Sequence, residues 1–484
     1  DLELLDLLLA EDGVDLGAAP NVIPRRSEGA SVPLSYGQEL IWLLECASPG
    51  LTAYKLPIAR RLRGELDVGA LERSFTALIA RHEALRTRFA VVDGEPAQVI
   101  DAPCRATTDL IDLSAMDRSE REERTATLLR ERAFKPFDLA KEHCFRSTLV
   151  RLADLEHVLL IETHHIVSDG WSLRVLFRDL EAYYRAYVHG VEAEIAPLAV
   201  QYADYVLWER GAFSLQLPAM LDYWRAELAG SLEPLELPTD FPRPPAPTFQ
   251  GARALLQLPP DLLARAKELA RRHGATLYML LLAVYGTVLH RYTGRVGILV
   301  GSGAAARAHR ETESTIGYFT DVLVQRVDFS GDPTFEELLG RVRESCLRAY
   351  EHQGVPLEKL IVELRGAEPR FSHPSLFEVV LTPQDTIPVA FALAGVHVEP
   401  YAIDFAATKF DLALLPGESD DGLRLTVLYR RELFAPETME RFLAHVRSVL
   451  VAAVSDATQR VARLPLLDPA EEALIATVNA TAAD

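Results

Sequence analysis

The sequence contains few cysteines and no long hydrophobic run. Only 4 of its 484 residues are cysteine, and they lie far apart without a Cys-x-x-Cys pair. This spacing is neither that of a disulfide framework nor that of a zinc site, so we expect reduced cysteines in a cytoplasmic protein. No apolar run approaches the roughly 20 residues of a membrane-spanning helix. The Leu-rich stretch 2–9 lacks the basic region and the cleavage site of a signal peptide.

Positive charge is also scarce. The chain has 50 Lys and Arg residues against 70 Asp and Glu residues, which gives a formal net charge of -20. An acidic chain without a long Lys/Arg block has little affinity for a phosphate backbone. We therefore expect neither a nucleic-acid partner nor a membrane partner.

What the chain has in abundance is hydrophobic residues, at 49%. This share is ample for large cores, and the length corresponds to two to four compact units. Strand-like and helix-like segments alternate, which predicts an α/β fold with two lobes. We predict a tether at residues 1–30, a first lobe at 31–212, a second lobe at 213–463 and a tail at 464–484. Since the chain begins with Asp1 rather than Met, we expect a piece of a longer protein.

The apolar patterns predict the individual elements. Asp67 is placed to cap the helix that follows it, and six prolines between 234 and 247 predict an extended connection. The expected strands are 56–66, 87–92, 97–100, 145–152, 158–163, 255–258, 296–300 and 322–327. The expected helices are 68–81, 120–134, 172–187, 202–208, 220–228, a segment opening at 259–261 and ending at Gly274, 277–289 and 335–350.

The stretch His164-His165-Ile-Val-Ser-Asp169-Gly170 carries the strongest chemical signal. It follows a predicted strand, along which successive side chains point to opposite faces. One histidine should therefore face the core and the other a cavity, and we expect His164 to be the core residue. Ser-Asp-Gly predicts a turn, after which Trp171 and Ser172 begin a helix with Ser172 as a possible N-cap.

A metal site is the less favoured interpretation of these histidines. Adjacent ligands on a strand diverge, and no third His or Cys ligand is close in the sequence. Asp169 could be no more than a turn residue on composition alone. A histidine at a strand end, beside a turn and a helix start, is suited to proton transfer or hydrogen bonding.

The pattern HHxxxDG between a strand and a helix resembles the signature of nonribosomal peptide synthetase condensation domains, relatives of chloramphenicol acetyltransferase. Six further segments resemble motifs of this family in the same order. They are LSYGQELIW (34–42), RHEALRTRF (81–89), YADYVLW (202–208), IGYFTDVLVQR (316–326), HQGVPLE (352–358) and, loosely, residues 370–377.

The chain departs from the family pattern at three motif positions. Leu40 stands where the family usually has Arg, Asp321 where it has Asn, and Gly354 where it has Asp. None of these changes touches HHxxxDG, so activity is expected, although the subtype is left open. The two histidines exclude a cyclising relative, and the RHEALRTRF segment favours condensation over epimerisation.

The resemblance implies a fold of two chloramphenicol acetyltransferase-like lobes, arranged as a V-shaped pseudo-dimer with a central tunnel. It implies amide-bond formation between an acyl or peptidyl thioester on an upstream carrier protein and an aminoacyl thioester on a downstream one. The 4'-phosphopantetheine arms would belong to these carriers, and no tightly bound cofactor or metal is expected. An adjacent adenylation domain is a further expected partner, since residues 464–484 resemble the linker that leads into one. That tail could also be a simple terminal helix.

The resemblance also implies roles for single residues. His165 would face the cleft as a general base or as a group that orients the amine, while His164 completes the motif from the core. Asp169 would organise the turn through a salt bridge, for which Arg307 is a candidate partner, with Trp171 as structural support. The N–H of Gly170 could donate to the developing oxyanion.

Three other readings remain open at this point. SDGWS favours a donor of L configuration, but a starter domain that acylates the first amino acid remains possible. A stand-alone acyltransferase for soluble thioesters is a second enzyme reading. Some relatives lose the histidine motif and only recruit partner enzymes, and the intact motif argues against such a docking platform here.

Overall fold

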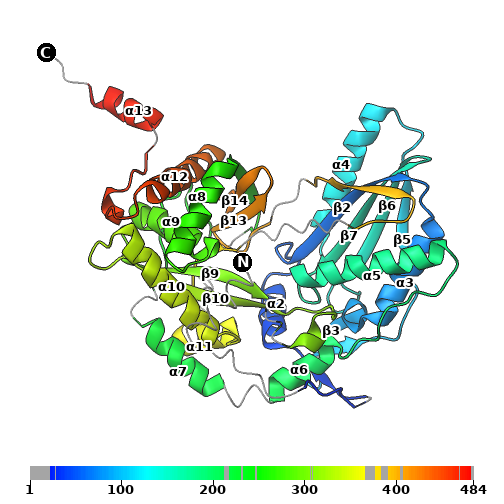
Figure 1. Ribbon diagram of the computed structural model, residues 1–484. Coiled ribbons are helices and arrows are strands. Elements are labelled where there is room, and N and C mark those ends of the chain that lie inside the picture. Colours follow the sequence, from blue (N-terminus) through cyan, green and yellow to red (C-terminus); the bar gives the residue numbers. More distant parts are fainter. Residues whose placement is uncertain are drawn as a thin grey trace.

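The computed structural model describes residues 22–27, 29–211, 217–229, 233–245, 248–305, 307, 309–365, 376–382, 391–403, 407–467 and 469–480. Within these ranges the chain forms two α/β lobes that meet at one end and diverge at the other, in the form of a V (Figure 1). The first half of the chain builds most of one lobe, and the second half builds most of the other. This is the two-lobed α/β fold predicted from the sequence, although most of the expected tether at 1–30 lies outside the described residues.

A five-stranded sheet in the order β12-β2-β7-β6-β5 forms the centre of the first lobe. Helices α3 and α5 cover one face, where they pack on Leu159 and Ile161, and α4 covers the other, where it packs on Val158 and Leu160. Because both faces are covered, β7 is buried along nearly its whole length. The elements are β2 (Lys55–Gly64), β5 (Thr108–Asp112), β6 (Phe145–Ala153), β7 (Glu156–His164), β12 (Val396–Tyr401), α3 (Val68–Arg81), α4 (Arg118–Phe134) and α5 (Gly170–Val188).

A small three-stranded sheet, β1-β4-β3, and two helices complete this lobe at the end where the lobes meet. Ser35 and Gln38 form a reciprocal capping box at the start of α2, which fixes where that helix begins. The elements are β1 (Val32–Pro33), β3 (Thr87–Val92), β4 (Glu95–Ile100), α2 (Tyr36–Ala47), α6 (Tyr202–Gly211) and the short 3₁₀ helix Glu83–Arg86.

The second lobe is built on a six-stranded sheet in the order β10-β9-β11-β13-β14-β8. Helices α8, α9, α10 and α12 contribute to one large apolar cluster on this sheet, while α7 and α11 belong to a smaller one. The elements are β8 (Gly251–Leu258), β9 (Gly297–Ala305), β10 (Thr320–Asp328), β11 (Val379–Leu381), β13 (Leu412–Ser419), β14 (Gly422–Arg430), α7 (Leu217–Glu227), α8 (Pro260–Arg272), α9 (Leu277–Thr293), α10 (Phe335–Glu351), α11 (Leu357–Arg365), α12 (Pro436–Ser455) and α13 (Pro469–Asn479).

Two segments of the second half of the chain cross to the first lobe. Strand β12 pairs antiparallel with β2 along its full length and so forms an edge of the first sheet. The connection from β9 to β10 brings Ile316 and Phe319 into the apolar core of the first lobe. The sequence did not predict either crossing, because each pairs segments that are distant in the chain. The predicted lobe boundaries themselves stay predictions.

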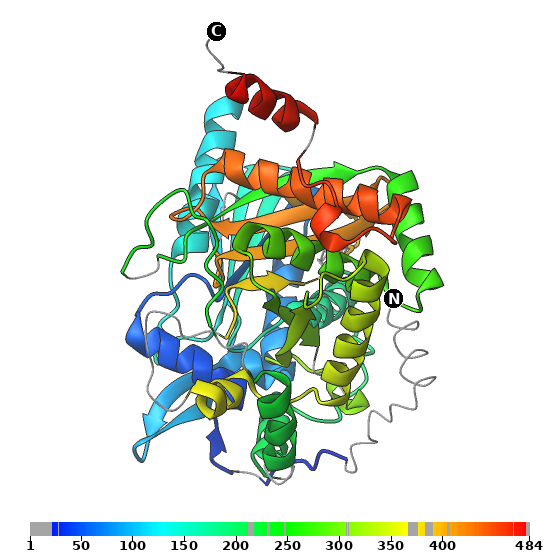
Figure 2. The same ribbon diagram turned by 90° about the vertical axis from the view of Figure 1, so that its left-hand side faces the viewer.

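Most predicted elements are present with small shifts at their ends. Helix α3 has the predicted bounds, with Asp67 accepting from the backbone N–H of Ala70, and β6 and β7 form the predicted antiparallel hairpin. Helix α8 begins with proline at its first position, and α9 is buried on all sides, as predicted. The described part of the proline-rich stretch is neither helix nor strand. The tail contains a helix, α13, which stands beyond α12 in both views (Figure 2).

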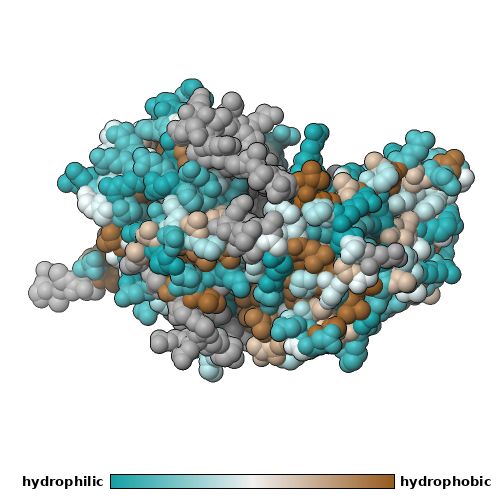
Figure 3. Space-filling model, turned by 90° about the horizontal axis from the view of Figure 1, so that it is seen from below, coloured by the Kyte–Doolittle hydropathy of each residue, from teal (hydrophilic) through white to brown (hydrophobic). Residues whose placement is uncertain are grey.

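None of the helices in the described part of the chain is by itself long and apolar enough to cross a membrane. Helices α8 and α9 reach that length only as a pair, and the chain bends by 101° between them. All four cysteines are free. Seen from below, hydrophobic side chains are visible over the middle of the molecule, whereas mostly hydrophilic side chains cover the two ends (Figure 3).

Candidate active site

The two histidines lie at the point where strand β7 turns into helix α5. The strand ends at His164, and the backbone N–H groups of Val167 and Ser168 close a turn by donating to the carbonyls of His164 and His165. The helix begins at Gly170. The strand therefore does not continue through both histidines, and it is this turn, rather than strand alternation, that separates their side chains.

His164 lies in the core of the first lobe, where the sequence places it, with 1% of its surface exposed. Its Nδ1 accepts from the backbone N–H of Ile166 at 3.2 Å, and its Nε2 lies 3.5 Å from a carboxylate oxygen of Glu45 on α2. Burial lowers the pKa of His164, and Glu45 opposes this change only in part. Its surroundings are those of a packed, neutral histidine.

His165 is only half-buried and has a different set of contacts. Its backbone N–H donates to the carbonyl of Tyr54 at 2.7 Å, and its ring meets the rings of Tyr54 and Tyr318 edge-on. Nδ1 lies 3.1 Å from the carbonyl oxygen of Ser168. A carbonyl only accepts, so Nδ1 carries the proton and Nε2 presents a lone pair. Burial, reinforced by the positive charge of Lys409, holds the pKa of His165 well below its usual value.

Asp169 is buried and makes three kinds of contact. It caps α5 by accepting from the backbone N–H of Ser172 at 2.7 Å, it accepts from the N–H of Phe319 at 3.0 Å, and it lies 3.3 Å from the guanidinium of Arg307. The expectation that Ser172 caps this helix is wrong. The Ser172 hydroxyl instead bonds the backbone of Gly317 and accepts from Arg307 at 2.9 Å, because the Asp169 carboxylate already reaches the helix N-terminus.

Arg307, the candidate partner of Asp169, thus lies beside it. Its guanidinium also donates to the carbonyls of Thr312 and Thr315, so it holds the β9–β10 connection together. Burial lowers the pKa of Arg307, and the charge of Asp169 counteracts this effect. The pair joins α5 of the first lobe to a segment of the second half of the chain.

Trp171 and Gly170 lie at the start of α5. The indole N–H of Trp171 donates to the carbonyl of Glu313 at 2.8 Å, and the Arg307 guanidinium lies 5.7 Å from the indole ring. These contacts, together with the Asp169–Arg307 pair, hold α5 against the β9–β10 connection, and we call this contact the joint between the lobes. Gly170 is exposed as the first residue of the helix. Its role as an oxyanion donor stays a prediction, as do the catalytic roles of the other site residues.

The structure adds three residues to the site that sequence reasoning missed. Tyr54 and Tyr318 flank His165, and the Nζ of Lys409 lies 4.0 Å from the centre of the Tyr54 ring. Burial lowers the pKa of Lys409 to about 7. Tyr318 could have been singled out because it falls within the motif at 316–326. Tyr54 and Lys409 lie outside the quoted motifs, so only the fold brings them to His165.

Tyr318 also lines a cavity of about 80 Å³. The three motif departures, Leu40, Asp321 and Gly354, all line it. Asp321 accepts from the backbone N–H of Gly354 at 2.9 Å, so these two positions are in direct contact. Burial raises the pKa of Asp321 to about 6 and that of Glu209, which lines the same cavity, to about 7. The departures therefore change one place beside the site rather than three unrelated places.

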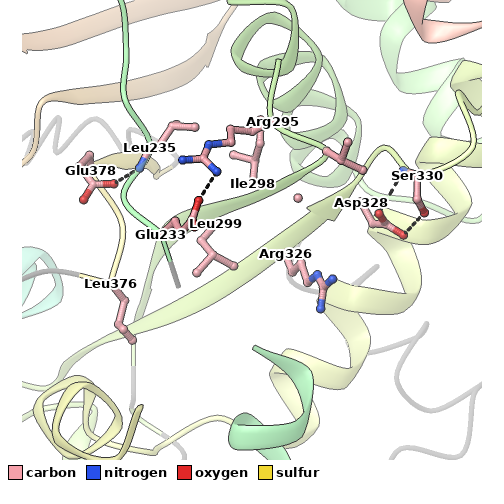
Figure 4. Close-up of a pocket in the computed structure, with 12 residues that line it drawn as sticks. Glu233, Leu235, Arg295, Ile298, Leu299, Arg326, Asp328, Ser330, Leu376 and Glu378 are labelled. Atoms are coloured by element: carbon pink, nitrogen blue, oxygen red, sulfur yellow. Dashed lines mark hydrogen bonds and ion pairs between the residues drawn. The ribbon is translucent and has the colours of Figure 1, made fainter. Parts of the chain in front are cut away.

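A cavity of about 380 Å³ lies in the second lobe, and none of the predicted site residues lines it. Arg295 forms an ion pair with Glu233, and Asp328 accepts from Ser330 (Figure 4). Glu378 accepts from the backbone N–H of Leu235. Arg295 with Glu233 and Ser330 with Asp328 are thus paired within the lining of this cavity. Across the described ranges, no three His, Cys, Asp or Glu side chains are arranged to hold a metal ion.

A family model described as "Condensation domain" matches residues 29–476. Over 450 residues the chain is 42% identical to one of the proteins that make up the linear gramicidin synthase of Brevibacillus parabrevis. The match covers 92% of this chain and 9% of that protein, so the chain spans about a tenth of the relative's length.

The chain is also similar to solved structures. The X-domain from teicoplanin biosynthesis is 30% identical, with a TM-score of 0.85 over 92% of this chain and 100% of the X-domain chain. The X-domain in its complex with OxyB is 31% identical, with a TM-score of 0.83 over 93% of this chain and 98% of that one.

Proposed function

The chain belongs to the condensation-domain family of nonribosomal peptide synthetases, which has the chloramphenicol acetyltransferase-like fold, and we propose that it forms an amide bond between two carrier-bound substrates. An upstream carrier protein presents the donor acyl or peptidyl thioester, and a downstream carrier presents an aminoacyl thioester. The observation that carries this proposal is His165, a neutral and half-buried histidine whose Nε2 lone pair is available beside the joint between the lobes.

In the proposed reaction the acceptor α-amine attacks the donor carbonyl carbon. A C–N bond forms, the C–S bond breaks, and the amine proton ends on the released thiol of the upstream carrier. Nε2 of His165 either accepts that proton as a general base or orients the amine through a hydrogen bond. Holding both pantetheine arms in one tunnel supplies much of the acceleration, because thioester aminolysis mainly needs alignment.

The other site residues support this reaction from the start of α5. The Gly170 N–H lies at a helix N-terminus, where a developing oxyanion is stabilised. Asp169 and Arg307 act by holding α5 against the β9–β10 connection, with Trp171 reinforcing the joint. In this proposal the 4'-phosphopantetheine groups belong to the carriers, and the chain itself binds no cofactor tightly.

A donor of L configuration is the favoured substrate type, because the SDGWS sequence after the histidines resembles that of domains that join two L-residues. A starter domain that acylates the first amino acid is the closest alternative. A stand-alone acyltransferase for soluble thioesters is the next one. An adenylation domain is proposed as the neighbour after α13, and the four free cysteines support a cytoplasmic location.

A docking platform without catalysis is a second candidate function. It is favoured by one observation, the similarity to an X-domain that has been solved in complex with OxyB. The complete histidine motif and the lone pair on His165 argue against it. Any turnover that depends on His165 would dismiss it.

The test uses one carrier loaded with a donor acyl group and a second carrier loaded with an aminoacyl group. Mass spectrometry of the acceptor carrier should show a gain equal to the donor acyl group. The gain should require both carriers, should disappear in His165→Ala and should persist in His189→Ala, which alters an exposed histidine at the end of α5. Equal rates with soluble thioesters and free amines would overturn the two-carrier proposal.

A further inference from the structure

Lys409 reaches the histidine site from the other lobe. It lies between β12 and β13 in the second half of the chain, and its Nζ stands 4.0 Å from the ring centre of Tyr54. Tyr54 is also the residue whose carbonyl accepts the backbone N–H of His165 and whose ring contacts the imidazole. One aromatic side chain therefore separates a lysine of the second lobe from the histidine of the first.

The ammonium group of Lys409 has little to compensate its burial. In the part of the chain that the structure describes, no carboxylate forms a salt bridge with this group. Its Nζ instead makes a cation–π contact with the face of the Tyr54 ring. A tyrosine face stabilises a cation more weakly than a carboxylate does. Burial accordingly lowers the pKa of Lys409 to about 7, so the group gains its charge just below neutral pH.

The titratable groups around this lysine come from three elements. Tyr54 lies just before β2, His164 is the last residue of β7 and His165 follows it. The positive charge of Lys409 acts on both histidines. Glu45 on α2 acts on His164 and Tyr54. Lys55 on β2 also acts on His164, but its own charge is paired with Glu162. Lys409 has the largest effect of the charged groups on His165.

We infer that Lys409 is a positioning residue that keeps His165 in its neutral, proton-accepting form when the medium turns slightly acidic. Below neutral pH the lysine takes up a proton, and its charge then opposes a second proton on the nearby imidazole. Since the lysine belongs to one lobe and the histidine to the other, this protection exists only while the lobes keep their present contact.

Three substitutions separate charge from packing. Lys409→Met keeps an unbranched apolar chain on Tyr54 and removes the cation, whereas Lys409→Arg keeps both the cation and the stacking. Lys409→Gln is a second neutral variant in case Met disturbs folding. Lys267→Met, which removes an exposed lysine on α8 that pairs with Glu418, is the control for the loss of one positive charge.

The direct measurement is an NMR titration of protein labelled at histidine Cε1, in which the signal missing from His165→Ala identifies His165. The Met and Gln variants should protonate His165 at higher pH than the parent protein, while Arg and the Lys267→Met control should not. If both neutral variants titrate like the parent protein, or stay neutral over the same pH range, the inference is overturned. This titration needs no substrate, so its result is independent of the proposed function.

The kinetic measurement rests on the proposed function. The ratio of amide-forming rates at pH 6 and pH 8 should fall roughly three- to tenfold in Lys409→Met relative to the parent protein, and stay unchanged in Lys409→Arg. A lysine that only packs on Tyr54 would give a flat ratio in both variants, which would overturn the inference. If no protein forms amide, the proposed function fails and the NMR titration still decides the role of Lys409.

Discussion

The first lobe buries charged side chains at its centre, whereas the central helix of the second lobe is buried without any charge. Lys55 and Glu162 form an ion pair in the first sheet with 0% and 1% of their side chains exposed. By contrast, α9 buries 12 of its 17 residues, none of them charged, and the hydroxyl of Thr287 among them bonds its own helix. Buried charges cost more stability than apolar packing does. The first lobe is thus less stable than an apolar core would make it, at the sheet that carries the histidines. The second lobe has an apolar central helix, and its chain contributes Arg307 and Lys409 to the contact between the lobes.

The largest expected effect is that of removing His165, the half-buried histidine at the end of the first sheet. His165→Ala should lower the rate of amide formation by roughly 10²–10⁴-fold, because it removes the proposed proton acceptor. The melting temperature should change little, since the side chain is only half-buried. Mass spectrometry of the product and thermal unfolding would measure the two effects.

The matched variant is His164→Ala, which removes a packed side chain from the core. It should mainly lower the melting temperature, because the N–H of Ile166 loses its partner. A fully stable but inactive His164→Ala, together with an active His165→Ala, would reverse the assignment of the two histidines.

The next largest effect should come from breaking the buried ion pair between Lys55 and Glu162. Lys55→Met leaves Glu162 as an uncompensated buried charge and should cost about 3–5 kcal/mol of unfolding free energy. The double variant Lys55→Met/Glu162→Gln should recover part of this loss, because no lone charge remains. Urea unfolding followed by circular dichroism measures both.

Leu281→Ala on α9 is the counterpart in the second lobe. The variant should lower the free energy of unfolding by about 2–5 kcal/mol, because it leaves an apolar cavity. This loss should be the same between pH 6 and pH 8, because the substitution does not change the surroundings of any charged group. If the single and double variants of the first lobe are equally unstable, the contrast between a charged and an uncharged centre does not hold.

Asp169→Asn should have a smaller effect on stability and should lower activity at the same time. Asparagine can still cap α5, but Arg307 loses its buried counter-charge, at a cost of ~1–3 kcal/mol. The melting temperature and the rate of amide formation should fall together, because both depend on the contact between α5 and the β9–β10 connection. Asp179→Asn, which disturbs another buried pair on the same helix, should lower stability without a loss of activity per folded molecule. An inactive Asp169→Asn with an unchanged melting temperature would instead indicate direct chemistry by Asp169.

The smallest effect concerns the cavity between the lobes. Burial raises the pKa of Glu209 from 4.5 to about 7 in the folded protein. The folded state therefore binds a proton that the unfolded state has already released, so stability falls as pH rises from about 4.5 through 7. Glu209→Gln should raise stability at pH 8 by on the order of 1–2 kcal/mol and change it little at pH 4.5. Melting temperatures at the two pH values test this, and an equal change at both would contradict it.

The parts of this molecule that could be predicted from sequence are the local ones. The bounds of α3, the β6–β7 hairpin and the core position of His164 all follow from patterns within a few residues. The cap of α5 was missed because Asp169 and Ser172 both have capping side chains, and the turn geometry decides between them. Lys409 and β12 were missed for another reason. They meet Tyr54 and β2 only after the chain has returned from the other lobe, and no local pattern encodes that return.

The placement of β12 at the edge of the first sheet has a consequence for synthesis on the ribosome. Arg63 on β2 donates a hydrogen bond to Glu399 on β12, and the two residues lie 336 positions apart in the chain. At roughly 5–20 residues per second, β2 leaves the ribosome on the order of 20–60 s before the strand that will cover it. During that interval its edge presents unpaired N–H and C=O groups to any other nascent chain. The first lobe is thus begun first but is completed only when β12 emerges, after β8, β9, β10 and β11 of the second lobe have already been made. Until then the exposed edge of β2 is open to aggregation, so the yield of folded protein should depend on how well chaperones shield it.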